Sequence, residues 1–213
     1  MPKPLSRSYQ DLGMSIHQKY PTLPNYRIIA ELRRLQEIAN LTRDLVGKNI
    51  LDIGCGSKNS KDLPGGLTKL WYRFFDPHVL EQFEPWYCRI AHEARAKIIG
   101  LDIEPNNESF ETFQVDLLEQ NAFEQFDDES FDAVNNYKCT IPRNSRQAHM
   151  ACSPAIMKRY DMNFERAFEL DDAVRRQVER LLKPRGIYTV AEFVYRKEKG
   201  GLKLTRVMDG LGS

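Results

Sequence analysis

Three short strand candidates, each ending in an aspartate, constrain this chain more than any other feature. The aspartates are Asp52, Asp102 and Asp116. Runs of this kind are typical of buried strands in a parallel sheet, whose two faces are both covered. Because the carboxyl ends of parallel strands open onto one crevice, we expect the three carboxylates at the same edge. They would repel one another unless a cationic or donor-rich ligand lay among them.

Strand candidates alternate with amphipathic helical stretches along most of the chain. Phe131–Val134 and Gly186–Phe193 predict further strands, and Tyr26–Leu45, Glu84–Arg95 and Asp171–Leu182 carry apolar residues at helical spacing. The first residue of the last helical stretch is a plausible N-cap. Such alternation predicts an α/β fold in which helices cover both faces of a parallel sheet.

The C-terminal part predicts a change of strand direction. Gly200-Gly201 separates two apolar stretches, Ile187–Tyr195 and Leu202–Met208. This spacing is typical of a hairpin, which would add one antiparallel strand at or near the edge of the sheet. Few residues follow, so we expect a sheet shortened at the C-terminus, of about six strands.

A glycine turn follows the first aspartate directly, as Gly54-Cys55-Gly56. Glycine permits a tight strand-to-helix turn and lets a ligand approach the backbone closely. The dinucleotide fingerprint G-x-G-x-x-G needs a third glycine where this chain has Asn59. Asp52 before the turn would also repel a pyrophosphate, and suits a ligand that carries an amino group. Both features disfavour an NAD(P)-dependent oxidoreductase.

Five motifs in one order resemble a known family. Ile50–Gly56 resembles the first motif of class I S-adenosylmethionine-dependent methyltransferases, Phe131–Tyr137 resembles their fourth-strand segment, and Leu181–Tyr188 resembles the turn into their fifth strand. Two further motifs, which contain Asp102 and Asp116, lie between the first and the fourth-strand segment. The resemblance extends from Tyr26 to Phe193. It implies a Rossmann-like, doubly wound, mostly parallel sheet and methyl transfer from S-adenosyl-L-methionine.

The resemblance also implies roles for individual residues. Asp102 matches the acid that hydrogen-bonds the ribose hydroxyls, and Asp116 with Leu117 matches the pair that brackets the adenine. Asn135 and Asn136 fall beside the methionine moiety. The cofactor-binding residues that it implies are Asp52, Ile53, Gly54, Cys55, Gly56, Asp102, Ile103, Asp116, Leu117, Asn135 and Asn136.

The chain departs from the family in its loops. Lys58 stands at the position of the family's third glycine. We expect a single domain over 1–213, with an N-terminal arm over 1–25 and insertions over 59–80 and 138–165. Long insertions are commonly lids or binding loops, so we expect these segments to form the substrate pocket. The aromatic run Trp71–Phe75 lies inside the first insertion and predicts either a pocket wall or an anchor to the core.

Catalysis needs few protein groups. The methyl moves by in-line displacement from a sulfonium, so the protein mainly positions the partners. A base is needed only if the acceptor starts protonated. Tyr137, after the fourth strand candidate, and His149 are candidates, with a packed aromatic and a surface histidine as the alternatives. The four cysteines lack the spacing of a zinc site, and no metal site is expected.

Composition narrows the partners. The chain has 31 Lys and Arg against 30 Asp and Glu, a formal charge of +1, which disfavours a generally basic nucleic-acid binder. No apolar run has the length of a membrane span, and the first residues lack the apolar core of a secretory signal. We therefore expect a cytoplasmic enzyme with no membrane partner. Charge is uneven along the chain: Ile98–Tyr137 is acidic and Arg175–Arg206 is basic, which predicts either solvated faces or two walls of a cleft.

Several functions remain open at this point. Asn135-Asn136 lacks the Asn/Asp-Pro-Pro-aromatic signature of methyltransferases that act on base or glutamine nitrogens, which favours a small-molecule acceptor. The alternatives are a non-catalytic S-adenosylmethionine-binding or regulatory protein, and an RNA or protein methyltransferase that uses the basic C-terminal block. The sequence identifies neither the acceptor nor the oligomeric state.

Overall fold

One sheet forms the centre of the molecule. A computed structural model describes residues 6–42, 44–57, 65–75, 84–119, 121–136, 139–145 and 163–208. The strands are β1 (Asn49–Ile53), β2 (Lys97–Asp102), β3 (Glu111–Gln114), β4 (Phe131–Asn136), β5 (Leu182–Val190), β6 (Phe193–Glu198) and β7 (Gly201–Val207). The helices named below are α1 (Arg7–Lys19), α2 (Asn25–Thr42), α3 (Gly66–Phe75), α5 (Trp86–Glu93) and α8 (Phe164–Leu181).

The strand order is β3-β2-β1-β4-β5-β6-β7. Strands β1 to β5 pair in parallel, whereas β6 runs antiparallel to both of its neighbours. This arrangement confirms the expected doubly wound, mostly parallel, Rossmann-like sheet with an antiparallel C-terminal part. The chain moves outward from β1 to β3 and then returns to place β4 on the other side of β1. That reversal creates a switch point between β1 and β4, where sheets of this type bind ligands.

The C-terminal strands differ from the sequence expectation. The described chain has seven strands in this sheet rather than six, because the predicted strand Gly186–Phe193 is broken by a turn. Val190 pairs with Phe193 across that turn, and Ala191 has a φ of 47°. The turn, Ala191-Glu192, contains neither glycine nor proline, so the sequence pattern did not reveal it. The expected hairpin at Gly200-Gly201 is present between β6 and β7.

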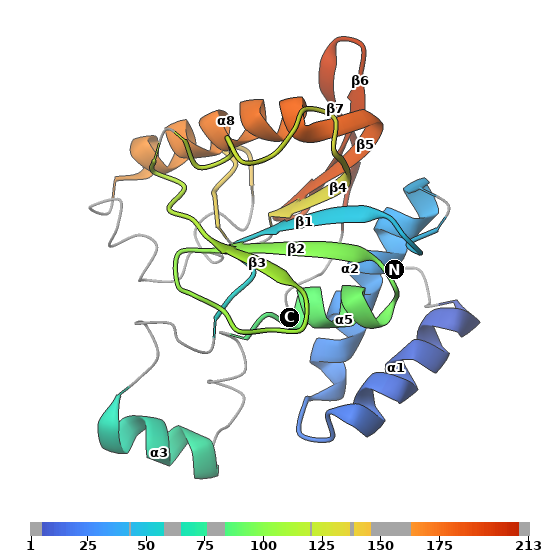
Figure 1. Cartoon of the computed structure of the whole chain (residues 1–213), viewed down its shortest axis with the longest axis vertical. Coiled ribbons are helices and arrows are strands. Elements are labelled where there is room, and N and C mark those ends of the chain that lie inside the picture. The colour runs from blue at the N-terminus through green and yellow to red at the C-terminus, as the bar shows by residue number, and fades with distance from the viewer. Residues whose placement is uncertain are drawn as a thin grey trace.

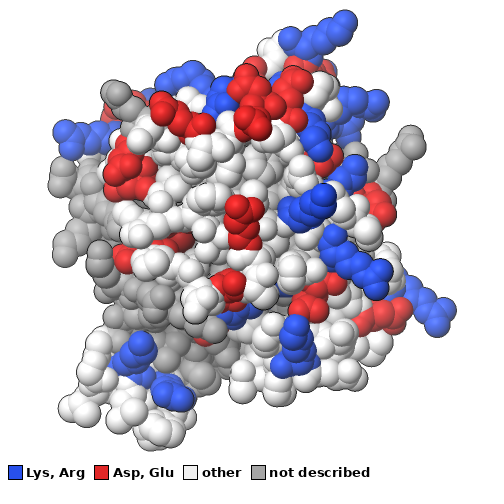
Figure 2. All heavy atoms as spheres, viewed as in Figure 1, with Lys and Arg blue, Asp and Glu red and all other residues white. Residues whose placement is uncertain are grey.

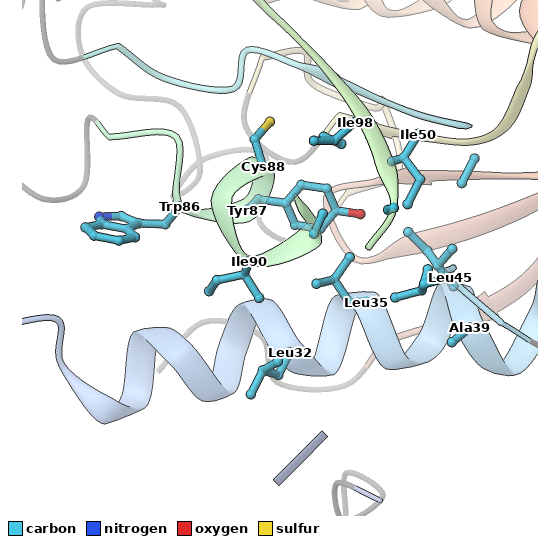
Figure 3. Packing of buried hydrophobic residues seen from close by; sticks show 14 of the residues in the cluster. Leu32, Leu35, Ala39, Leu45, Ile50, Trp86, Tyr87, Cys88, Ile90 and Ile98 are labelled. Atoms are coloured by element: carbon cyan, nitrogen blue, oxygen red, sulfur yellow. The ribbon is translucent and has the colours of Figure 1, made fainter. Parts of the chain in front are cut away.

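Successive residues of β1 point to opposite faces of the sheet, as pleating requires. Ile50 packs in the core formed with α1, α2 and α5, whereas Leu51 packs in the core under α8. Figure 1 shows α8 on one face of the sheet and α1, α2 and α5 on the opposite face. In Figure 3, Tyr87 and Ile90 of α5 lie over α2 near Leu35. Each face therefore has its own buried core.

Helix α8 differs from its predicted extent. Helix α8 begins at Phe164 and not at Asp171, because the Asn163 side chain accepts hydrogen bonds from the backbone N–H groups of Glu165 and Arg166. Asp171 is a buried residue in mid-helix that accepts a hydrogen bond from Thr140. Its carboxylate therefore bonds across to another segment and does not cap the helix.

The predicted N-terminal arm contains helix α1. Ile16 of α1 and Leu23 after it are buried against the α2 side of the core. Their burial shows that this segment contributes to the packed body, although its sequence has little apolar periodicity. No helix among the described residues combines the length and the apolar character needed to cross a bilayer.

The acidic and basic blocks of the sequence meet in the folded chain. Arg180–Asp128, Lys183–Asp132 and Lys197–Glu129 are ion pairs between the blocks, with N···O distances of 2.5, 2.8 and 3.1 Å. Figure 2 shows basic and acidic side chains side by side on the visible face. These pairs place members of the two blocks together on β4, β5, β6 and the segments beside them. The blocks therefore partly neutralise one another, and these pairs do not form opposite walls of a cleft.

Candidate functional site

The turn after β1 crosses over the end of β2. Gly54 and Gly56 have φ angles of 70° and 93°, in the left-handed region that favours glycine. The backbone N–H groups of Gly54 and Cys55 both donate to the carbonyl oxygen of Leu101, at 2.8 and 2.9 Å. These bonds fix the turn at the carboxyl edge of the sheet, and Gly54 is exposed there.

A cysteine from the segment after β4 packs on this turn. A Cβ atom at Gly54 would lie 2.6 Å from Sγ of Cys139, which is shorter than any real contact of this kind. Gly54 therefore needs glycine both for its backbone conformation and for space. The contact joins the turn after β1 to the segment after β4, on the two sides of the switch point.

Asp102 connects β2 to the same turn. One oxygen of its carboxylate, Oδ2, accepts a hydrogen bond from the backbone N–H of Gly56 at 2.9 Å, and Oδ1 accepts one from the N–H of Glu104 at 3.0 Å. The side chain is only half-buried, and a carboxylate offers about four acceptor positions. The structure thus brings together two groups that the sequence singled out separately.

The loop between β2 and β3 closes against the turn from the other side. The Nδ2 group of Asn106 donates to the carbonyl oxygen of Gly56 at 2.7 Å. Arg89 of α5 holds the same loop by a bidentate contact with Glu108, in which Nε and Nη2 donate at 3.0 and 2.5 Å. Its Nη1 group also donates to Glu84 at 2.5 Å. Sequence reasoning missed Asn106 and Arg89, because no local pattern connects them with the glycine turn.

Asp52 lies inside the protein beneath the turn. Its side chain is 3% exposed, and its carboxylate accepts hydrogen bonds from Nδ2 of Asn135 at 2.6 Å and from Sγ of Cys88 at 3.2 Å. Thr189 in turn donates to Oδ1 of Asn135 at 2.7 Å. Burial raises the pKa of Asp52 to about 7, against the opposing effect of the two hydrogen bonds. The expected residues Asp52 and Asn135 do meet, but they bond each other.

Asn136 faces the opposite side of the sheet from Asn135. It is fully buried, and its Nδ2 donates to Thr140 at 2.7 Å and to the Tyr188 hydroxyl at 3.0 Å. Thr140 donates onward to Asp171. Burial raises the pKa of both Asp171 and Tyr188. The Oδ1 atom of Asn136 is buried without a hydrogen-bond partner in the described structure.

The remaining expected cofactor residues lie at the ends of β1, β2 and β3. Ile53 is buried, and Ile103 is half-buried just after β2. Asp116 follows β3 by two residues and is half-buried, with Oδ1 accepting from the N–H of Leu118 at 3.0 Å. Leu117 packs partly against the core under α8. The acceptors of Asp102 and Asp116 thus lie at the ends of two neighbouring strands.

Some expected positions cannot be placed. Tyr137 and His149, the two catalytic candidates, lie outside the described residues, as do most of 138–165 and much of 59–80. Within the part of the chain that is described, no group of three or more His, Cys, Asp or Glu side chains could hold a metal ion.

Comparison with known proteins adds one distant similarity. No protein-family model matches the chain, and no curated protein matches it. The chain is similar to the solved structure of Burkholderia thailandensis 1,6-didemethyltoxoflavin-N1-methyltransferase with bound 1,6-didemethyltoxoflavin and S-adenosylhomocysteine. The identity is 11% and the TM-score is 0.36, over 98% of this chain and 77% of that chain. A similarity this distant carries no evidence about the activity of the present chain.

Proposed function

We propose that this chain binds S-adenosyl-L-methionine at the carboxyl edge of β1, β2 and β3 and transfers its methyl group to a small molecule. The observation that carries the proposal is the bond between Asp102 and the N–H of Gly56. It joins an acid at the end of one strand to a glycine turn at the end of the next, beside the switch point of the sheet. The order of the sequence motifs supports the same assignment.

The polar groups at this edge fit a nucleoside. We assign the half-buried carboxylate of Asp102 to the two ribose hydroxyls, and the half-buried carboxylate of Asp116 to the exocyclic amine of adenine. Gly54 is exposed at the turn on the side away from Cys139, so a ligand on that side would meet its backbone. We assign backbone contacts with the ligand to this turn and to Ile103 and Leu117.

The buried polar groups have a different proposed role, which is to position the strand ends. Asp52, Asn135 and Thr189 bond one another across β1, β4 and β5, so they hold the three strand ends in register. We assign Asp52 and Asn135 as positioning residues beneath the methionine end of the ligand. A direct contact of Asp52, Asn135 or Asn136 with the ligand remains a prediction.

The chemistry makes modest demands on the protein. When bound, the cofactor supplies a methyl group on a cationic sulfur, which is the electrophile. The chain's own residues have to hold the acceptor atom in line with that group and exclude water. We propose that Tyr137 or His149 accepts a proton from the acceptor where its nucleophilic atom starts protonated. A cytoplasmic location is part of the same proposal.

A thermal-shift comparison tests the proposal without knowledge of the acceptor. A ligand that binds only the folded state raises the unfolding temperature in proportion to the logarithm of its concentration over Kd. We expect S-adenosylhomocysteine to raise the unfolding temperature, and NAD at the same concentration to leave it unchanged. Stabilisation by NAD alone would support the oxidoreductase alternative. Stabilisation by neither would contradict the proposed cofactor site.

A further inference from the structure

Helix α3 presents a continuous apolar face that the rest of the described structure leaves uncovered. Leu67 is 84% exposed, Phe74 is 72% exposed and Phe75 is 74% exposed, and no residue of the helix is buried. Figure 1 shows α3 apart from the sheet and from the helices that cover it. The aromatic run is therefore not anchored to the core of the described residues, and its alternative part in a pocket wall stays a prediction.

The side chains of α3 are segregated by chemistry. Its apolar members are Leu67, Leu70, Trp71, Phe74 and Phe75. At 100° per residue they occupy an arc of about 140°. Lys69 and Arg73 fall on the opposite side of the helix, and the helix contains no acidic residue. In Figure 2, which has the same view as Figure 1, the α3 region shows white and blue side chains.

We propose that this face of α3 binds the surface of an anionic phospholipid bilayer. Helices that lie in a membrane interface combine Trp, Phe and Leu on one face with Lys and Arg on the other, as α3 does. The two cations would lie near the headgroups, where each Lys or Arg strengthens binding by about fivefold. At ten residues, or about 15 Å, the helix is too short to cross a bilayer and would lie in its plane.

Charge favours the bilayer over a second copy of the chain. Two α3 faces packed together would leave Lys69 and Arg73 of both copies on the outer sides of the pair, with no acid on either helix to neutralise them. An anionic surface supplies the opposite charge. This inference departs from the sequence expectation of no membrane partner. That expectation rested on the absence of a spanning run, and a short interfacial helix has no such run.

Vesicle binding of the full-length protein tests the inference. The probes are vesicles of phosphatidylcholine with and without phosphatidylserine, measured by cosedimentation. We expect binding to the mixed vesicles, reduced by added salt and much weaker without phosphatidylserine. Trp71 is 54% exposed whereas Trp86, the other tryptophan, is buried. The fluorescence of Trp71 should therefore shift to the blue when the mixed vesicles are added.

Variants on the two faces of α3 separate the contributions of its apolar and basic side chains to vesicle binding. Trp71→Gln with Phe74→Gln should abolish vesicle binding, and Lys69→Gln with Arg73→Gln should weaken it by about thirtyfold. Thr68→Gln, an exposed change outside the apolar arc, is the matched control and should bind like the wild type. All these side chains are exposed, so the thermal unfolding midpoint should stay constant.

Three results would overturn the inference. One is the absence of vesicle binding, and another is equal binding to both vesicle types. The third is self-association without lipid that is lost with Trp71→Gln and Phe74→Gln, or a Trp71 fluorescence shift without lipid that is lost with Phe74→Gln alone. A shift caused by S-adenosylhomocysteine would identify α3 as a lid. Self-association that increases with protein concentration would identify it as a dimer contact.

Discussion

The burial of Asp52 disfavours the charged form of its carboxyl group. It lies under the glycine turn with Asn135 and Cys88 as hydrogen-bond donors, and burial raises its pKa from 3.8 to about 7. Burial also raises the pKa of the Cys88 thiol well above its usual value, so this group remains a donor at neutral pH. The folded state thus holds a proton on Asp52 over a range in which the unfolded chain has released it.

The raised pKa of Asp52 predicts a pH dependence of stability. Because the folded pKa lies above the unfolded one, the stabilising contribution is complete below about pH 4 and is lost as the pH rises to about 7. The free energy of unfolding should fall over this interval by on the order of 4 kcal/mol from this group. Urea unfolding of the wild type and of Asp52→Asn at several pH values measures the difference. Identical pH profiles would show that the proton is not on Asp52.

Gly54 offers a second prediction at the residue scale. Gly54→Ala forces a Cβ to within 2.6 Å of Sγ of Cys139 and keeps a φ of 70°. Gly47→Ala is the matched control, because Gly47 has a φ of 69° with nothing within 4 Å of an added Cβ. We expect Gly47→Ala to cost about 1 kcal/mol and Gly54→Ala distinctly more. Adding Cys139→Ala should recover part of the Gly54→Ala loss.

Urea unfolding measures these three free energies. Equal losses for Gly54→Ala and Gly47→Ala would contradict the contact with Cys139. If Cys139→Ala restored the wild-type free energy of unfolding, the left-handed backbone conformation at Gly54 would contribute nothing to the loss.

At the scale of elements, the start of α8 depends on one side chain. Asn163 accepts hydrogen bonds from two N–H groups of the first turn, so Asn163→Ala should lower the free energy of unfolding by about 1 kcal/mol. Ser6, at the start of α1, makes no such bond, and Ser6→Ala should cost much less. Asn163→Asp keeps an acceptor and should remain close to the wild type in urea unfolding. A similar loss for both alanine variants would mean that the Asn163 cap contributes nothing.

The sequence predicted elements where their periodicity was local. β1, β2, β4 and the body of α2 follow from short apolar runs or helical spacing, and the structure confirms them. The predictions failed where a boundary depended on a single residue, as with Asn163 at the start of α8 and the turn at Ala191. Neither boundary carries a glycine or proline that would have marked it in the sequence.

At the scale of the whole molecule, the predictable part of the candidate site is its framework. The glycine turn and Asp102 were found from motifs and do meet at one edge. The interior of that edge was not predictable. Asp52 reaches partners 36 and 83 positions away in the chain, and only the fold reveals that its carboxylate is buried. The ion pairs between the acidic and basic blocks are non-local in the same way.

A calorimetric titration with S-adenosylhomocysteine tests the central claim most directly. The wild type should bind it in one saturable event. Asp102→Asn should bind it about tenfold more weakly or worse, because a hydrogen bond to a charged group is lost. Glu111→Gln, an exposed change at the far end of β3, is the control and should keep the wild-type affinity. No binding by the wild type, or an affinity that Asp102→Asn leaves unchanged, would contradict the claim that this edge holds the cofactor.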